Sequence, residues 1–392
     1  MRCHPAALVG GSRVELADIV RARGEHYERT HRLAVCQRRA LAAIVRCRTA
    51  ALGGHRRQCD ACGAVRVVYN SCRNRHCPKC PTVAKERWLA ARRDELLPVP
   101  YFHVVFTLPH ELNLLAQMQP RPLYALLFRA AAQTLLAFAD RHLGGPPAIT
   151  VVLHTWGRNL SQHLHLHCLV SGGALRRDTQ DWTPAPAGFL FPVRALARVF
   201  RARFLDGLRN LDDAPPGSAD ARAAQALHAG LRRKTWVVYC KPPIAGPEQV
   251  LEYLARYTHR IALSNDRIVS FDGQTVRFRW KDHRDGQVKI LALEAEEFLR
   301  RFLLHVLPDR FVRIRHYGIL GNRARRKLQL ARERLGVAPQ KPRPRESVAE
   351  IVRRLTGEDL DACPLCHVGR LRAVQVLPPE PRLRPTPTWD TS

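Results

Sequence analysis

The sequence predicts an α+β protein in which a central, mainly antiparallel sheet is flanked by helices and preceded by a cysteine-rich ribbon. Three observations carry this prediction. Strand-like runs alternate with amphipathic helices, histidines alternate with leucines over residues 163–167, and two Cys-x2-Cys pairs occur near the N-terminus. At 392 residues the chain exceeds the usual size of one hydrophobic core. We therefore expect three regions, which span residues 1–97, 98–307 and 308–392.

The composition indicates a polyanionic partner. The chain has 64 Lys and Arg residues against 34 Asp and Glu residues, which gives a net charge of +30 at pH 7. Such an excess favours nucleic acid, because each neutralised phosphate releases condensed counterions. The sequence shows no run of about 18 apolar residues and no signal-peptide pattern. We expect a cytoplasmic, nucleoid-associated protein whose cysteines are thiols or metal ligands rather than disulfides.

The first cysteine cluster has the spacing of a tetrahedral zinc site. Cys59 and Cys62 form one Cys-x2-Cys pair, and after 14 intervening residues Cys77 and Cys80 form another. Thiolates on two such tight turns can close around a structural Zn²⁺ ion, so these four cysteines are the most economical ligand set. Three further groups remain as alternative ligands or as part of a second ion's shell, and they are His55, Cys72 and His76.

Basic side chains occur throughout this cluster, Arg73 and Arg75 among them. They predict a ribbon that contacts DNA, and an ordinary solvated face is the alternative interpretation. An incomplete zinc motif follows near the C-terminus, where Cys363 and Cys366 form a third Cys-x2-Cys pair. A zinc ion bound there would need further ligands from elsewhere in the fold.

Local patterns predict the remaining elements in chain order. Apolar periodicity near 3.6 residues, with Pro or Gly at the ends, predicts helices over residues 82–97, 123–143, 194–211, 248–260, 294–307 and 322–335. Runs of β-branched and aromatic residues predict strands over residues 101–108, 149–156, 235–240, 268–271, 275–281 and 288–293. A short link that contains Gly157 joins one of these strands to the histidine run, which predicts an antiparallel hairpin. The proline-rich segment 378–392 predicts a disordered tail.

The histidine run is the most informative feature of the chain. Successive side chains of a strand point to opposite faces, so His163, His165 and His167 share one face. Neutral imidazole is the most common ligand for a divalent ion, and such a pair leaves coordination positions for a substrate oxygen. The competing interpretation is a set of partly solvated surface histidines. The third ligand stays open among His154, Gln162, His163 and Gln249.

Two tyrosines lie four residues apart in the predicted helix 248–260. In a helix, Tyr253 and Tyr257 would present their phenols on one face, with Arg256 and Arg260 beside them. The arginines suit contact with phosphate. Packing of both rings in the core is the alternative interpretation.

Taken together, these motifs resemble the rolling-circle transposases of bacterial insertion sequences, and more narrowly the two-tyrosine HUH type of the IS91 (insertion sequence ninety-one) family. The resemblance rests on the cysteine ribbon, the stretch 153–157, the histidine row followed by Gly172-Gly173, and the Tyr-x3-Tyr pair. It covers roughly residues 25–312. Leu164 stands where the family commonly has proline, so two overlapping His-hydrophobe-His pairs satisfy the motif.

The resemblance implies an HUH-endonuclease-like sheet with His165 and His167 as metal ligands and with Tyr253 and Tyr257 as nucleophiles. It implies that the protein nicks and rejoins single-stranded DNA through a 5′-phosphotyrosine intermediate, with Mg²⁺ or Mn²⁺ polarising the scissile phosphate. The implied partners are single-stranded DNA at element ends, target DNA and host replication factors. Two alternatives stay open: a plasmid replication initiator or relaxase with the same chemistry, and a non-enzymatic zinc-ribbon DNA-binding protein.

Overall fold

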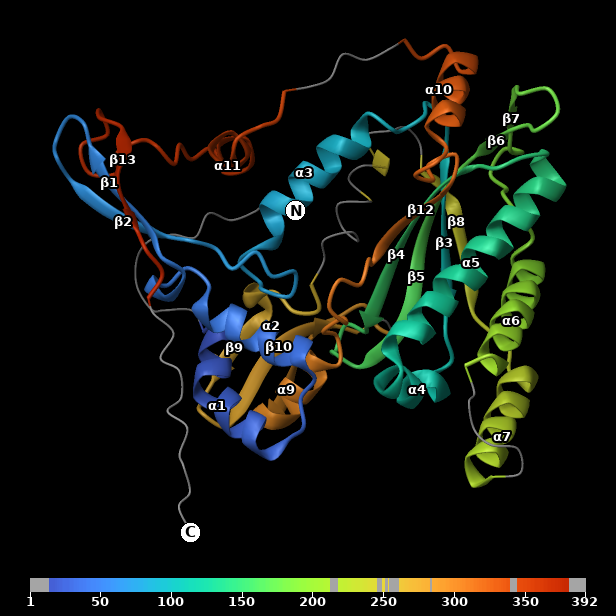
Figure 1. Ribbon diagram of the computed structural model, residues 1–392, viewed down its shortest axis with the longest axis horizontal. Helices are drawn as coiled ribbons and strands as arrows, with labels where there is room; N and C mark the ends of the chain where they lie inside the picture. The colour runs from blue at the N-terminus through green and yellow to red at the C-terminus, as the bar shows by residue number, and fades with distance from the viewer. Residues whose placement is uncertain are drawn as a thin grey trace.

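The computed structural model describes residues 14–211, 218–244, 249–250, 253, 261–282, 284–338 and 344–380, and every structural statement below concerns these residues. They form helices and antiparallel sheets, which confirms the predicted α+β class (Figure 1).

A five-stranded antiparallel sheet forms the centre of the larger lobe (Figure 1). Its strand order is β12-β4-β5-β3-β8. The strands are β3 (Tyr101–Thr107), β4 (Ala148–Trp156), β5 (Gln162–Ser171), β8 (Val238–Ile244) and β12 (Ile314–Gly318). The histidine strand β5 is therefore the middle strand, and its antiparallel pairing with β4 confirms the predicted hairpin.

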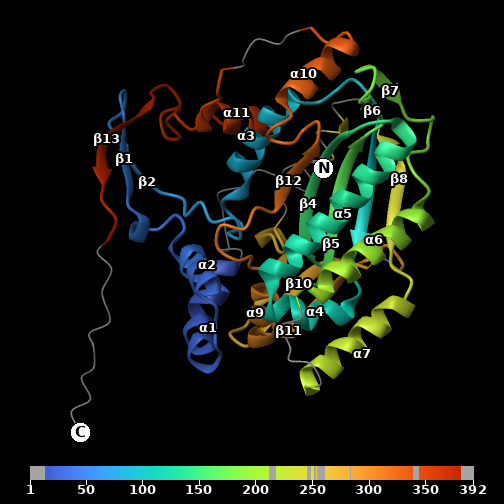
Figure 2. The same ribbon diagram turned by 45° about the vertical axis from the view of Figure 1, so that its right-hand side comes forward.

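Long helices cover one face of this sheet (Figure 2). The core between them contains Leu164 and Leu166 of β5 together with apolar residues of β3 and β4. The helices are α4 (Asn113–Met118), α5 (Pro120–Leu143), α6 (Val193–Arg209) and α7 (Ala219–Arg233). Helix α5 is long and apolar enough to cross a membrane, yet 61% of its apolar window is buried within the protein. Its composition is thus explained by its place in the core.

A second hydrophobic core joins the beginning of the chain to a segment far along it. Residues of α1 and α2 pack there against a three-stranded sheet of order β11-β10-β9 and against α9 (Figure 1). These elements are α1 (Leu16–Thr30), α2 (Val35–Arg46), β9 (Ile268–Phe271), β10 (Thr275–Lys281), β11 (Val288–Glu294) and α9 (Ala295–Leu303).

The cysteine ribbon is a third sheet, of order β13-β1-β2. Strands β1 (Gly54–Cys59) and β2 (Val65–Tyr69) form a hairpin, and β13 (Leu371–Leu377) pairs antiparallel with β1. Three further helices are α3 (Pro81–Arg93), α10 (Arg325–Arg334) and α11 (Val348–Thr356). Helix α10 lies near one end of the central sheet, whereas α11 lies between α3 and the ribbon (Figure 1). A small two-stranded sheet and short 3-10 helices complete the fold, and they are β6 (Gly173–Leu175), β7 (Trp182–Pro184), η1 (Ala50–Leu52), η2 (His110–Leu112) and η3 (Asn265–Arg267).

The predicted elements and regions compare with the structure as follows. The helices expected over 82–97, 123–143, 194–211, 294–307 and 322–335 correspond to α3, α5, α6, α9 and α10. Most of the helix expected over 248–260 and of the tail 378–392 lies outside the described residues. The division at residues 97 and 307 stays a prediction, and strand pairing crosses it twice, since β12 joins the central sheet and β13 joins the ribbon.

Candidate functional site

The central strand β5 carries the histidines, and its alternation sorts them from the leucines as expected. Leu164 and Leu166 are buried in the core under the helices. His165 and His167 therefore lie on the opposite face of the sheet, where both are half-buried.

A third imidazole joins them from the neighbouring strand. His154 of β4 is the register partner of His165, and it is buried. One ring nitrogen from each of His154, His165 and His167 lies within 4.8 Å of the other two. Three imidazoles at that spacing can bind one divalent ion and leave positions on it for oxygen ligands. The residues present therefore fit the expected metal.

Of the four candidates left open for the third ligand, the structure groups His154, and not His163, with His165 and His167. His163 is exposed, and the three-imidazole group contains His154 in its place. The backbone carbonyl of His163 instead accepts a hydrogen bond from Nδ1 of His165, with N···O 2.8 Å. This hydrogen bond occupies Nδ1, which leaves Nε2 of His165 as the nitrogen that could bind an ion.

A further histidine, which sequence reasoning did not select, supports the group from strand β3. His103 is 2% exposed, and its Nε2 lies 2.8 Å from Nδ1 of His167. The same argument assigns metal ligation by His167 to Nε2. The only sequence signal for His103 was a polar residue inside an otherwise apolar strand. Burial lowers the pKa of His103 to about 3 and that of His165 to about 4, so both imidazoles are neutral at pH 7.

Tyr253 lies beside this group. Its ring centroid is 4.7 Å from that of His103, and the residue is half-buried. The Tyr253 ring thus contacts the imidazole that is hydrogen-bonded to His167 of the three-imidazole group. The second predicted nucleophile, Tyr257, lies outside the described residues, as do Arg256 and Arg260.

The cysteines form two separate groups of four rather than one. The first group is Cys47, Cys72, Cys77 and Cys80, and the second is Cys59, Cys62, Cys363 and Cys366. In each group all four sulfurs lie within 4.8 Å of one another. Sulfurs at the corners of a tetrahedron with Zn–S bonds of ~2.3 Å are about 3.8 Å apart. The spacing in both groups therefore suits a zinc ion.

The predicted zinc set of Cys59, Cys62, Cys77 and Cys80 is accordingly wrong. Its first pair lies at the tip of the β1–β2 hairpin, whereas its second pair follows the base of that hairpin. Five paired residues at ~3.4 Å each separate tip from base by about 17 Å, which one ion cannot bridge. Cys47, at the end of α2, completes the group at the base and lacked any local motif.

The remaining candidates near the ribbon have other contacts. Nε2 of His76 accepts a hydrogen bond from the backbone N–H of Leu307 (3.4 Å), and burial lowers its pKa to about 3. His55 lies on β1, is exposed and belongs to neither cysteine group. Nη1 of Arg75 donates a hydrogen bond to the carbonyl of Phe311 (2.7 Å). This contact joins the loop between Cys72 and Cys77 to the segment before β12.

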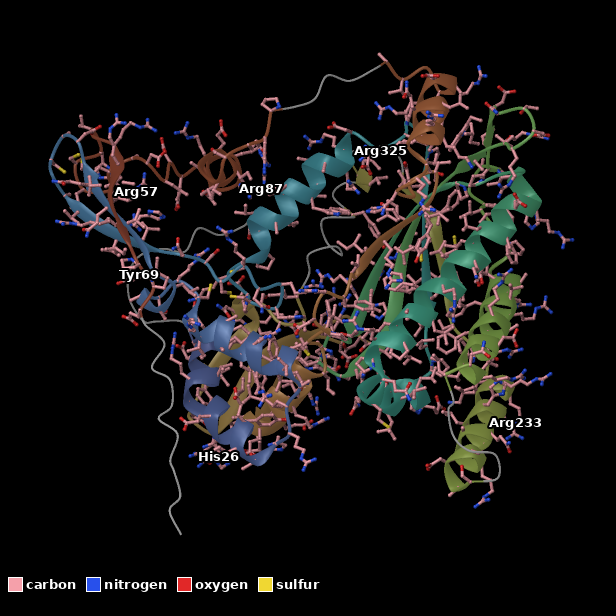
Figure 3. All side chains as sticks on the ribbon, viewed as in Figure 1. His26, Arg57, Tyr69, Arg87, Arg233 and Arg325 are labelled. Atoms are coloured by element: carbon pink, nitrogen blue, oxygen red, sulfur yellow. The ribbon has the colours of Figure 1, made fainter. Side chains whose placement is uncertain are left out.

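Cationic side chains cover much of the outer surface, as Figure 3 shows for Arg87 on α3, Arg325 on α10 and Arg233 on α7. All three are exposed. A polyanion that lies along the described surface would therefore meet positive charge at several separate elements.

Two protein-family models match this chain, one over the region with the imidazoles and one over the region with the first cysteine group. Residues 148–327 match a family model described as "Putative transposase", and residues 19–108 match one described as "Transposase zinc-binding domain". The first range contains the three imidazoles and Tyr253, and the second contains the cysteine group that includes Cys47.

Whole-chain relatives carry related descriptions. The chain is 47% identical over 394 residues to "Putative transposase y4qJ" of Sinorhizobium fredii, which covers 96% of this chain and 98% of that protein. It is 29% identical over 338 residues to "Transposase for insertion sequence element IS801" of Pseudomonas savastanoi pv. phaseolicola, covering 82% and 80%. Among solved structures, the conjugative relaxase TrwC in complex with mutant oriT DNA aligns with 15% identity over 60% of this chain and 73% of that chain, at a TM-score of 0.24.

Proposed function

This chain belongs to the IS91-like family of insertion-sequence transposases, and on that premise we propose that it nicks and rejoins single-stranded DNA through a covalent phosphotyrosine. The proposed substrates are the single-stranded ends of a mobile element and its target DNA, with host replication factors as further partners. We place this activity in the cytoplasm, in association with the nucleoid, because the DNA substrate is there.

One observation carries the proposal. Three imidazoles from adjacent strands converge within 4.8 Å, and the Tyr253 ring contacts the histidine that supports one of them. Such a group is what a divalent ion needs, and a phenol beside it is what covalent phosphoryl transfer needs. When bound by His154, His165 and His167, Mg²⁺ or Mn²⁺ would withdraw charge from the scissile phosphate and the leaving oxygen.

The residues of the chain supply the rest of the chemistry. The phenolic oxygen of Tyr253 attacks the phosphorus, the bond from phosphorus to the 3′-oxygen breaks, and the leaving 3′-oxygen takes up the proton that the phenol loses, which gives a free 3′-hydroxyl. The product is a 5′-phosphotyrosine whose bond to the enzyme replaces the broken phosphodiester, so strand joining requires no ATP. A phenol has an ordinary pKa of ~10, so at neutral pH its attack needs removal of its proton or stabilisation of the developing charge. We assign contact with the flanking phosphates to Arg256 and Arg260.

Two tyrosines permit two successive transfers. We propose that Tyr257 forms the second linkage, on the other end of the element or on the target strand. The reverse attack by a free 3′-hydroxyl on either phosphotyrosine then joins strands and restores the phenol. A single nucleophile would have to be released before it could accept the second strand.

Covalent capture of an oligonucleotide tests the proposal. Full-length protein is incubated with single-stranded oligonucleotides from the element ends and with Mn²⁺, and adducts are resolved in a denaturing gel. We expect an adduct that is lost when Tyr253→Phe and Tyr257→Phe are combined.

Two histidine variants test the metal assignment. His154→Ala removes a proposed ligand on β4 and should abolish the adduct. His163→Ala changes an exposed histidine on the neighbouring strand β5 and should leave the adduct intact. The reverse result would show that the ion is bound by the two overlapping pairs of β5 alone. If the wild-type protein binds DNA but forms no adduct, the result would favour a non-enzymatic zinc-ribbon protein.

A further inference from the structure

We propose that the C-terminal segment completes a second zinc site, formed by Cys59 and Cys62 of the ribbon and by Cys363 and Cys366, and that its ion fastens residues 344–380 to the N-terminal ribbon. No match described above assigns this site, because the zinc-binding family model ends at residue 108.

The sulfur geometry matches an ion rather than a covalent bond. Sγ of Cys59 lies 3.7 Å from Sγ of Cys366, and Sγ of Cys62 lies 3.7 Å from Sγ of Cys363. A disulfide needs about 2.05 Å, whereas the edge of a ZnS₄ tetrahedron is about 3.8 Å. Each close pair joins one cysteine of the ribbon to one cysteine about 300 residues later in the chain.

Both Cys-x2-Cys turns have the backbone of a zinc knuckle. The N–H of Gly63 donates to the carbonyl of Cys59 (3.1 Å), and the N–H of His367 donates to the carbonyl of Cys363 (3.0 Å). The N–H of Gly369 also donates to Sγ of Cys366 at 3.3 Å. An amide that donates to sulfur stabilises thiolate, which is the form that binds zinc.

The cysteine count within the zinc-binding range supports a second ion. Four of its cysteines already form the group at the base of the hairpin. Three others remain in this range: Cys36 on α2, which belongs to neither group, and Cys59 and Cys62 at the hairpin tip, which offer two thiols where a structural zinc ion needs four ligands. The C-terminal pair supplies the other two.

We expect the ion to be a major fastener of this segment, because the apolar core beside the β1–β13 pairing is small. The apolar core between the ribbon and residues 344–380 contains three buried residues, Cys59, Cys363 and Leu371. On β13, Val374 and Val376 are 53% and 71% exposed, so the strand buries little surface. A core of that size contributes little stability by itself, and small folds of this kind usually add a metal or another crosslink.

Polar contacts also connect the segment to the ribbon and to α3. Figure 3 shows Arg57 on the ribbon beside the C-terminal segment, where it pairs with Asp361 (2.5 Å). Nε of Arg372 lies 3.1 Å from Asp60, and Nη1 of Arg354 on α11 lies 3.2 Å from Glu86 on α3. Both arginines are substantially exposed, and exposed pairs contribute modestly to stability.

Cobalt substitution counts the thiolate sites. Full-length protein is purified under reducing conditions and loaded with Co²⁺, whose thiolate charge-transfer absorption does not arise at an imidazole site. We expect two tetrahedral thiolate sites per chain, and the combined variant Cys363→Ser, Cys366→Ser should lose half of the absorption. The combined variant Cys72→Ser, Cys80→Ser should lose the other half. The matched control Cys36→Ser, Cys240→Ser changes cysteines outside both groups and should lose none.

Limited trypsin digestion gives an independent readout on the zinc-loaded protein. Trypsin should release residues 344–380 faster from the Cys363, Cys366 variant than from the wild type. Fragments of the central lobe should stay equally protected. One thiolate-bound ion in the wild type, or full cobalt absorption in the Cys363, Cys366 variant, would overturn the proposal. Loss of all absorption in that variant, together with digestion of the central lobe, would overturn the claim that the ion is a separate site that fastens residues 344–380.

Discussion

His103 gives a direct test of how the imidazole group is oriented. We expect His103→Phe to weaken Mn²⁺ binding or strand cleavage 10- to 100-fold, the usual effect of removing a hydrogen-bond partner from a metal-ligating histidine. That range corresponds to about 1.4 to 2.7 kcal/mol. It agrees with the roughly 1 to 3 kcal/mol that a buried polar group costs when it loses its partner.

The structure favours phenylalanine as the replacement. His103 is 2% exposed, so a smaller residue would leave a cavity and add a packing defect to the result. Phenylalanine fills the space and can keep the ring contact to Tyr253, now 4.7 Å between centroids, yet it cannot bond to Nδ1 of His167 at 2.8 Å. The substitution therefore isolates the hydrogen bond.

Calorimetric titration with Mn²⁺ and single-turnover cleavage measure the two effects separately. His103→Gln keeps a hydrogen-bonding group and should recover part of the loss, while His110→Phe, at a side chain that is 81% exposed, should change neither quantity. If His103→Phe bound Mn²⁺ and cleaved DNA within twofold of wild type, the orientation argument would be refuted.

Three further predictions concern stability, measured by urea denaturation of zinc-loaded protein. Gly318→Ala should lower the free energy of unfolding by more than about 1 kcal/mol, because Gly318 has φ +64° and a Cβ there would lie 1.8 Å from the carbonyl oxygen of Pro147. Gly230→Ala, in α7 with open space around the added Cβ, should instead raise it by about 0.5 to 1 kcal/mol, and equal effects at the two glycines would contradict the steric argument. Burial lowers the pKa of His305 to about 4, so below the unfolded pKa of ~6.5 only the unfolded chain takes up the proton. Stability should therefore fall between pH 7 and pH 5, by about 2 kcal/mol from this histidine, and a His305→Asn variant with an unchanged pH slope would refute the assignment.

The sequence predicted the histidine face because strand alternation is a local property. Leu164 and Leu166 lie in the core and His165 and His167 lie on the other face, as a period of two requires. The third ligand depends on which residue of β4 lies opposite His165, and that register is set by long-range packing. His154 was therefore one of several candidates rather than a definite choice.

The cysteines show the same division between local and long-range information. The Cys-x2-Cys spacing correctly indicated zinc knuckles, because each knuckle is a tight turn of a few residues. Which cysteines lie together depends on the hairpin that separates Cys62 from Cys77 and on the return of the chain that brings Cys363 beside Cys62. Cys47 is a single cysteine after a helix, so it carried no spacing signal.

The place of β12 at the edge of the central sheet has a consequence for biosynthesis. Residues 314–318 pair with residues 148–152, so β4 has an open edge until the ribosome has delivered its late partner. Pairing across such a sequence separation is slow to form. A nascent chain that stops before residue 314 would expose that edge to other polypeptides, and we expect chaperones or aggregation to remove such fragments.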